Sequence, residues 1–264
     1  MVRSLSEHLP DREIRGVRVE YEPLIAHPEL DEFKRLVAGK RITTLKRRGK
    51  YILIKLEPFW LVVHLRMTGR LLFLPASSKV EKHTNLIFFL DQDYHLRFVN
   101  PRKFGRIYLL CEEELDRVSG MYKLGPEPLA PEYDLDAFLE SFKGRRANIK
   151  SLLLNQSFLA GLGNIYSDEA LFLAGLDPHR KADSLSLQEK ERLYYAIKDV
   201  LQEGIKYRGT TISDYLDGEG RGGSFQERLK VYGREGESCL RCNQQLLKEK
   251  IAGRGSCYCP DCQL

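Results

Sequence analysis

The stretch Cys239-Leu240-Arg241-Cys242, followed after sixteen residues by Cys259-Pro260-Asp261-Cys262, is the strongest indication of fold in this chain. Each Cys-x2-Cys pair can present two thiolates from one tight turn, and the residues between the pairs are enough for a short hairpin that brings them together. Four thiolates surround Zn²⁺ tetrahedrally and leave no open coordination position. The spacing therefore predicts one structural zinc ion, Zn2+, held by Cys239, Cys242, Cys259 and Cys262.

Ordinary buried or disulfide-bonded cysteines are the alternative. Cys257 is a candidate substitute ligand, but only Cys259 completes the spacing, and Cys111 is interpreted as a buried, small apolar residue. The opening residues 1–8 lack the apolar core of a signal peptide, and no later run reaches membrane-spanning length. We therefore expect a cytoplasmic protein without a membrane partner, in a compartment where thiols stay reduced.

Composition indicates a globular protein long enough for two domains, with 264 residues, 42% apolar and 30% charged. The net charge of +5 is modest, but residues 40–50 form a basic stretch with few acids. Such a cluster can line a phosphate track on a nucleic acid. A solvated strand face is the alternative.

Residues 13–111 contain short runs rich in β-branched and aromatic residues, broken by Gly, Pro and polar clusters. Strands at this spacing predict an antiparallel sandwich or barrel, interrupted by a helix near Leu30 to Val37. The clearest runs are Tyr51 to Leu56, Trp60 to Leu65, Leu71 to Leu74, Asn85 to Leu90, Tyr94 to Val99 and Arg106 to Leu110.

Beyond a Pro-rich linker the periodicity becomes helical. Ser186-Leu187-Gln188-Glu189 is a capping-box pattern, which predicts a helix that carries Leu193, Ile197 and Leu201 on one face. We therefore predict an α+β fold with four parts: an N-terminal antiparallel β-sandwich domain (1–123), a linker (124–131), a helical domain (132–225) and a zinc-finger β-hairpin (226–264).

The segment Gly161-Leu162-Gly163-Asn164 lies between two helical stretches. Its glycines permit close backbone approach, and Asn164 stands where the next helix should begin. A helix start presents free N–H groups and partial positive charge, so a phosphate could dock there. An Asn N-cap that follows a Gly turn and binds no ligand is the alternative.

Six motifs in one order resemble the formamidopyrimidine-DNA glycosylases of bacteria. The resemblance implies a β-sandwich paired with a helix-two-turn-helix and a zinc finger, gripping bent, damaged double-stranded DNA as a monomer near the bacterial nucleoid. The motifs are His64 to Arg70, Asn100 to Gly105, Leu124 to Leu129, Gly163 to Tyr166 with Glu169, Val231 to Arg234, and Ala252 to Cys259.

The same resemblance implies roles for individual residues. Those that match the family's phosphate ligands are Lys50, His64, Asn164 and Arg254. Those that match its intercalating probe, which replaces the extruded base and meets the orphaned partner, usually cytosine, are Met67, Arg102 and Phe104. The loop that folds over an everted purine matches Thr210, Thr211, Gly220, Arg221 and Gly222.

Resemblance also implies an enzyme, a bifunctional DNA glycosylase and AP lyase of base-excision repair. Members remove 8-oxoguanine and formamidopyrimidines with an N-terminal proline amine, an adjoining Glu and β,δ-elimination. No residue here matches that Pro and Glu; Lys50 is the nearest candidate for an assisting amine. Two alternatives stay open: a catalytically inactive protein that binds lesions or abasic sites, and a zinc-ribbon module of transcription or translation.

Overall fold

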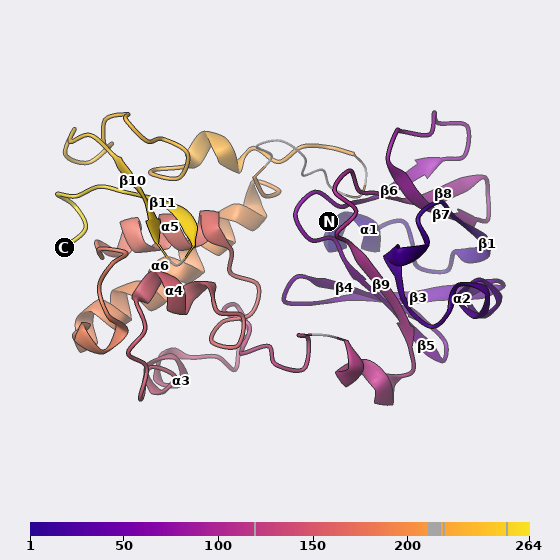
Figure 1. The fold of residues 1–264 in the computed structure, drawn as a ribbon, viewed down its shortest axis with the longest axis horizontal. Helices are drawn as coiled ribbons and strands as arrows, with labels where there is room; N and C mark the ends of the chain where they lie inside the picture. Colours follow the sequence, from indigo (N-terminus) through magenta and orange to yellow (C-terminus); the bar gives the residue numbers. More distant parts are fainter. Residues whose placement is uncertain (119, 211–217, 219, 252) are drawn as a thin grey trace. The chain divides into compact units, whose positions relative to one another are not determined.

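A computed structural model describes residues 1–118, 120–210, 218, 220–251 and 253–264. The chain divides into two compact units (Figure 1). The first comprises Met1–Tyr122 with Thr210–Gly223, and the second Lys123–Gly209 with Ser224–Leu264. Within the described residues, no helix has both the length and the apolar character needed to span a bilayer.

The first unit is built on nine strands in the order β2-β9-β5-β4-β3-β1-β7-β8-β6. All neighbours are antiparallel, as predicted, except β2 and β9, which pair in parallel at one edge. Its elements are α1 (Val2–Ser6), β1 (Glu13–Val19), η1 (Glu22–Leu24), β2 (Ile25–His27), α2 (Leu30–Val37), β3 (Lys40–Arg48), β4 (Tyr51–Leu56), β5 (Phe59–His64), β6 (Arg70–Pro75), β7 (Thr84–Leu90), β8 (Tyr94–Val99), β9 (Arg106–Leu110) and η2 (Glu112–Arg117).

The nine strands form two packed halves. Strands β1 and β3 share only two register pairs, Glu13 with Arg41 and Ile14 with Lys40. One buried core draws side chains from both halves, among them Ile54 and Leu61 on one side and Phe88 on the other. The predicted sandwich is therefore confirmed, because a sheet that folds over in this way buries the inner face of each half.

Helices dominate the second unit. Ser186 opens α6 as predicted, since its hydroxyl accepts the Glu189 N–H at 3.3 Å while Glu189 accepts the Ser186 N–H at 2.7 Å. The elements are α3 (Leu135–Glu140), α4 (Ile149–Leu154), α5 (Asn164–Ala174), η3 (Ala182–Ser184), α6 (Leu187–Lys206), η4 (Phe225–Arg228), β10 (Leu247–Ile251) and β11 (Arg254–Tyr258).

The turns that join α4 to α5 are held by one side chain. Gln156 donates from Nε2 to the carbonyls of Leu154 at 3.1 Å and Leu162 at 2.9 Å, and its Oε1 accepts the Gly161 N–H at 3.0 Å. This amide satisfies three backbone groups that no helix can pair. The start of α5 is therefore fixed relative to the end of α4.

Candidate nucleic-acid interface

Four cysteines of the second unit form a closed cluster. The Sγ atoms of Cys239, Cys242, Cys259 and Cys262 lie within 4.8 Å of one another. Cys239 and Cys262 are 3.9 Å apart, and Cys242 and Cys259 are 3.5 Å apart. A tetrahedral Zn²⁺ with Zn–S bonds of about 2.3 Å requires S–S separations of about 3.8 Å. The four thiols can therefore hold one metal ion with little movement.

The chemistry of these thiols suits a dication. Burial and the adjacent thiols raise the pKa of Cys262, and a bound dication would reverse that shift because it deprotonates coordinating thiols. Cys257 lies outside the group of four, and its backbone N–H donates to Asp168. Cys111 is half-buried and caps η2, so its interpretation as a buried residue is wrong.

Asn164 is the first residue of α5, after the N-cap Gly163. Its side-chain Nδ2 donates to the Gly255 carbonyl at 2.8 Å. Its Oδ1 is buried and has no hydrogen-bond partner among the described residues. The alternative of an Asn N-cap is therefore wrong, because Gly163 is the N-cap residue and the Asn164 amide bonds instead to the hairpin of β10 and β11.

Arg254 is exposed at the first residue of β11, where it pairs with Ile251 across the hairpin. Because Gly255 is the next residue, the bond from Asn164 places the free N–H groups of the helix start close to an arginine. Helix N-termini and guanidinium groups both favour phosphate. Within the second unit, two of the four predicted phosphate ligands are thus brought together.

A buried ion pair lies beneath this arrangement. Lys150 of α4 is fully buried and donates from Nζ to Asp168 Oδ1 at 2.6 Å and to the Asn164 carbonyl at 3.0 Å. Asp168 Oδ2 accepts the Cys257 N–H at 3.2 Å. Burial raises the pKa of Asp168, and Lys150 and this N–H oppose the rise. The pair connects α4, α5 and β11.

Glu169 links α5 to the segment that precedes the four cysteines. Its buried carboxylate accepts three backbone N–H groups, from Lys230 at 2.8 Å, Val231 at 3.0 Å and Tyr232 at 2.9 Å. Hydrogen bonds to a carboxylate are stronger than neutral ones, especially when buried. Glu169 therefore fixes the Val231 to Arg234 motif against α5.

In the first unit, His64 ends β5 and is 9% exposed. Its Nδ1 accepts the Arg66 N–H at 3.0 Å, which leaves Nε2 to carry the proton of the neutral ring. Burial, followed by the charges of Arg66 and Lys50, lowers the pKa of His64 to about 4. His64 is therefore a neutral Nε2–H donor at pH 7, close to the ammonium of Lys50.

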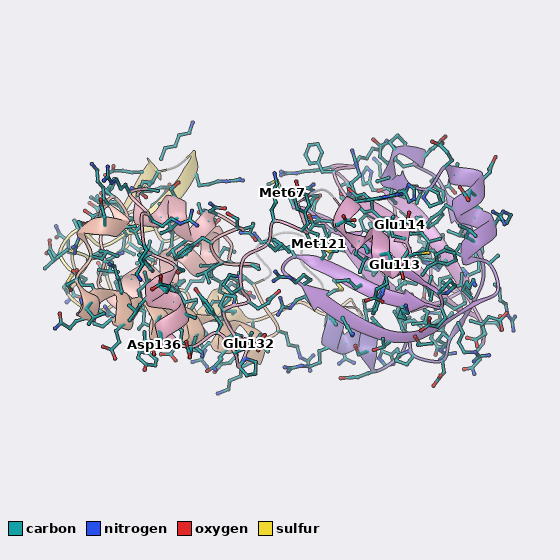
Figure 2. All side chains as sticks on the ribbon, turned by 90° about the horizontal axis from the view of Figure 1, so that it is seen from below. Met67, Glu113, Glu114, Met121, Glu132 and Asp136 are labelled. Atoms are coloured by element: carbon teal, nitrogen blue, oxygen red, sulfur yellow. The ribbon has the colours of Figure 1, made fainter. Side chains whose placement is uncertain are left out.

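Two loops of the first unit present apolar side chains to solvent. Met67 is 66% exposed and Phe104 is 57% exposed, and Arg102 Nη1 lies 3.8 Å from the Met67 sulfur. Met67 is labelled in Figure 2. Large exposed apolar side chains that meet a guanidinium are typical of an interaction site. The three predicted probe residues thus belong to neighbouring loops.

Internal bonds shape both loops. The Gly69 N–H donates to the Leu65 carbonyl at 3.1 Å, and a Cβ at Gly69 would lie 2.3 Å from that oxygen, so only glycine fits. With its amide in the orientation that satisfies its partners, Asn100 accepts the N–H groups of Phe104 at 3.2 Å and Gly105 at 2.7 Å. The backbone that carries the probe side chains is therefore held from within.

The predicted purine loop is described only in part, and Thr211 lies outside the described residues. Thr210 is half-buried, whereas Gly220, Arg221 and Gly222 are exposed. Gly220 has a φ of +79°, and a Cβ there would meet no described atom within 4 Å, so its backbone conformation alone favours glycine.

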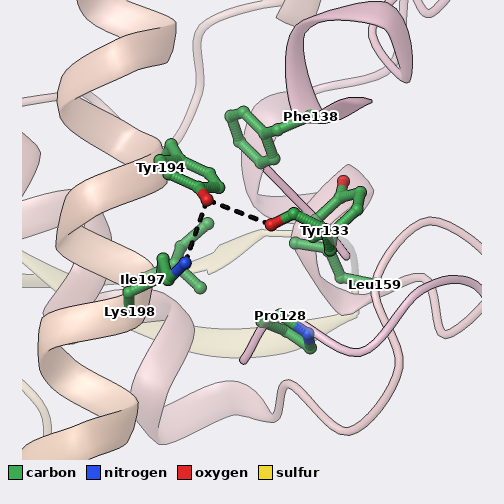
Figure 3. A pocket seen from close by; sticks show the side chains of 7 residues that line it. All are labelled: Pro128, Tyr133, Phe138, Leu159, Tyr194, Ile197 and Lys198. Carbon is green, nitrogen blue, oxygen red and sulfur yellow. Dashed lines mark hydrogen bonds between the residues drawn. The ribbon is translucent and has the colours of Figure 1, made fainter. Parts of the chain in front are cut away.

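A small aromatic pocket lies in the second unit, lined by Pro128, Tyr133, Phe138, Leu159, Tyr194, Ile197 and Lys198 (Figure 3). The Tyr194 hydroxyl donates to the Tyr133 carbonyl at 3.0 Å and accepts from Lys198 at 2.9 Å. The hollow between these side chains is too small to admit even a water molecule. The pocket is therefore a packing feature of the helical core.

Sequence reasoning missed Lys150, Asp168 and the bridging amide of Gln156. The available signal was a charge within an apolar helix, since Lys150 stands between Ile149 and the run Leu152–Leu154. A lysine is rarely fully buried unless it is paired. Its partner could not be identified from the sequence, because Asp168 is on another helix.

Comparisons with known proteins agree with this geometry. Residues 1–107 match the formamidopyrimidine-DNA glycosylase N-terminal domain, and residues 124–215 match the formamidopyrimidine-DNA glycosylase H2TH domain. The formamidopyrimidine-DNA glycosylase of Pelotomaculum thermopropionicum is 48% identical over 99% of this chain and 95% of its own length. The formamidopyrimidine-DNA glycosylase of Desulforamulus reducens is 45% identical over 100% of this chain and 96% of its own length.

Solved structures of Lactococcus lactis Fpg have the same fold as this chain. A complex between the Lactococcus lactis Fpg and an abasic-site-containing DNA superposes with a TM-score of 0.92 at 33% identity, covering 99% of this chain and 96% of that one. A complex of Lactococcus lactis Fpg (MutM) with Fapy-dG-containing DNA superposes with a TM-score of 0.91, again covering 99% of this chain and 96% of that one. The matched domains and the superposed structures define the chain as a DNA glycosylase. Within that class, the chain belongs to the formamidopyrimidine-DNA glycosylase family.

Proposed function

We propose that this protein binds damaged double-stranded DNA and removes oxidised purines, 8-oxoguanine and formamidopyrimidines, as a monomeric glycosylase and AP lyase of base-excision repair. The single observation that carries the proposal is the Asn164 to Gly255 bond, which joins a helix start to a hairpin strand beginning with Arg254. Family membership supplies the reaction class. The two Lactococcus lactis complexes support damaged DNA as the partner.

Phosphate binding is assigned to Lys50, His64, Asn164 and Arg254. Lys50 supplies a charge, Arg254 a guanidinium fork, and the start of α5 its free N–H groups. His64 supplies a neutral donor, because its lowered pKa keeps the ring uncharged at pH 7. Contacts of this kind pin the backbone on either side of a nucleotide that rotates outward.

Stacking is assigned to the exposed probe. Met67 and Phe104 are apolar and exposed, so inserting them between bases removes apolar surface from water. Arg102, next to Met67, can donate to the base left without its partner. The everted purine would be covered by the loop that includes Thr210, Thr211, Gly220, Arg221 and Gly222.

One structural zinc ion is assigned to the four-cysteine cluster. Four thiolates close the coordination shell, so the ion would hold the hairpin in shape and would not activate water. The domain limits predicted from the sequence, 1–123, 124–131, 132–225 and 226–264, remain part of this proposal.

The experiment pairs two chains on a duplex that contains 8-oxoguanine. One is the chain of 264 residues, and the other is the same chain extended at its amino end so that it begins with the family's proline and adjoining Glu. Borohydride trapping and release of the oxidised base are measured. We expect the extended chain to form a trapped complex through its proline amine, which identifies the attacking group. Absence of both trapping and base release from the extended chain would overturn the catalytic part of the proposal.

A further inference from the structure

The helix α1 and the residue Gly218 are bonded to each other within the first unit. The Ser4 hydroxyl accepts the Gly218 N–H at 2.9 Å and donates to the Met1 carbonyl at 3.0 Å. Gly218 in turn accepts the Phe73 N–H of β6 at 2.7 Å. Both backbone polar groups of one buried glycine are therefore satisfied by the N-terminal helix and the sheet.

The site admits only glycine. A Cβ at Gly218 would lie 2.5 Å from Leu5 Cδ2 and 2.9 Å from the Ser4 hydroxyl. Leu5 is fully buried in the core of the sandwich, so it has little room to yield. The close approach that excludes a side chain also brings the Gly218 N–H within reach of Ser4.

The bond from Phe73 to Gly218 lies at an edge of the sheet. Strand β6 ends the strand order and, among the described strands, pairs only with β8, so its outer N–H groups face no neighbouring strand. The Phe73 ring stacks on His8, after α1, with centroids 5.2 Å apart and planes 5° apart. It also stacks on Tyr94 at 4.6 Å. Gly218 is therefore held by hydrogen bonds to both α1 and β6, whose side chains pack on each other.

We propose that Ser4 is a positioning residue for recognition of the everted purine, and that it acts through Gly218. This inference rests on the proposed function, because Gly220, Arg221 and Gly222, which follow Gly218 by two to four residues, are there assigned to the purine. A flipped base is read by hydrogen bonds to its edge. Backbone N–H and carbonyl groups of these residues can make such bonds, so their placement sets selectivity. Fixing Gly218 fixes where these exposed residues begin.

The test compares two damaged duplexes of one sequence. One contains 2′-fluoro-8-oxodeoxyguanosine, whose base resists excision, and the other contains a tetrahydrofuran abasic analogue with no base to read. Ser4→Ala is compared with Ser4→Thr, which keeps the hydroxyl, and with Ser6→Ala, at an exposed position of the same helix. Thermal unfolding of each variant reports on folding.

We expect Ser4→Ala to weaken binding of the 8-oxoguanine duplex by about 3- to 10-fold, the loss expected for one hydrogen bond. Binding of the abasic duplex should change less than about 2-fold, and Ser4→Thr and Ser6→Ala should behave as wild type. Equal losses on both duplexes, or no loss on either, would overturn the inference. If the unaltered chain showed no preference for either lesion over undamaged DNA, the proposed function itself would fail.

Discussion

Asn164 and Gly255, ninety-one residues apart in the chain, are joined by one hydrogen bond of 2.8 Å between a side-chain amide and a backbone carbonyl. The bond attaches the first residue of α5 to the zinc hairpin immediately after Arg254. The two predicted phosphate ligands Asn164 and Arg254 are therefore held in a fixed position relative to each other. The buried Lys150–Asp168 pair reinforces this connection from below.

Replacing Asn164 by Ala should weaken binding to a duplex with an abasic site by about 1 to 3 kcal/mol, because a desolvated polar contact and the tie to Gly255 are both lost. Fluorescence anisotropy at fixed salt measures the change. Gln202→Ala, an exposed amide of α6, is the matched control and should leave affinity unaltered. Unchanged affinity in Asn164→Ala would show that this amide serves only the fold.

Removing one partner of the buried ion pair should destabilise the second unit. Lys150→Met leaves the Asp168 carboxylate buried without its counter-charge, at an expected cost of about 3 to 5 kcal/mol in free energy of unfolding. The double variant Lys150→Met with Asp168→Leu removes both charges and should recover much of this loss. Urea denaturation measures both, and equal destabilisation of the single and double variants would contradict the account.

Acid should weaken the fold through His64. The pKa of His64 is about 4 in the folded protein and 6.5 in the unfolded chain. Between these two values the unfolded chain is protonated at His64, whereas the folded protein is not. The stability from the neutral ring is therefore complete above pH 6.5 and is lost as pH falls through about 4, by up to about 3 kcal/mol. Urea denaturation between pH 4 and 7 should show a smaller decline in His64→Gln; identical declines would argue against the neutral ring.

The probe should contribute to binding without contributing to stability. Met67→Ala and Phe104→Ala remove exposed side chains, so each should alter the free energy of unfolding by less than about 0.5 kcal/mol. Each should weaken abasic-site binding by about 1 to 3 kcal/mol, through lost base stacking for Phe104 and lost apolar burial for Met67. Val80→Ala, also apolar and 44% exposed, is the control on the same unit. A loss in Val80→Ala as large as in the probe variants would indicate non-specific contact.

Metal removal should disconnect the hairpin. One zinc ion per chain is expected by elemental analysis, and Cys242→Ser should lose it, whereas Cys111→Ser should keep it. Loss of the ion should weaken binding of the abasic duplex at least about 10-fold, because Arg254 and Gly255 belong to the hairpin that the cluster closes. Full affinity in a metal-free chain would contradict a structural role.

Much of this arrangement could be predicted from the sequence, because the relevant signals are local. The spacing of the four cysteines predicts their cluster, and the capping box at Ser186 predicts the start of α6. The predicted limits of α2, Leu30 and Val37, are those observed. The parallel pairing of β2 with β9 was not foreseeable, because three residues carry no signal of direction.

The positioning contacts were also beyond reach of the sequence. Ser4 and Gly218 are separated by 214 residues, and neither residue type suggests the other. Lys150 and Asp168 face each other only because the turn held by Gln156 sets the angle between α4 and α5. Family resemblance supplied candidate DNA-contacting residues, but the groups that hold them in place became visible only in the structure.

The proposed function requires that this chain bind DNA specifically at a lesion. It is tested most directly by the dissociation constants for two duplexes of one sequence, one with a tetrahydrofuran abasic analogue and one undamaged, at the same salt concentration. We expect at least about 1,000-fold tighter binding of the damaged duplex, the lower end of the range of specific over non-specific recognition. Equal dissociation constants for the two duplexes would contradict it.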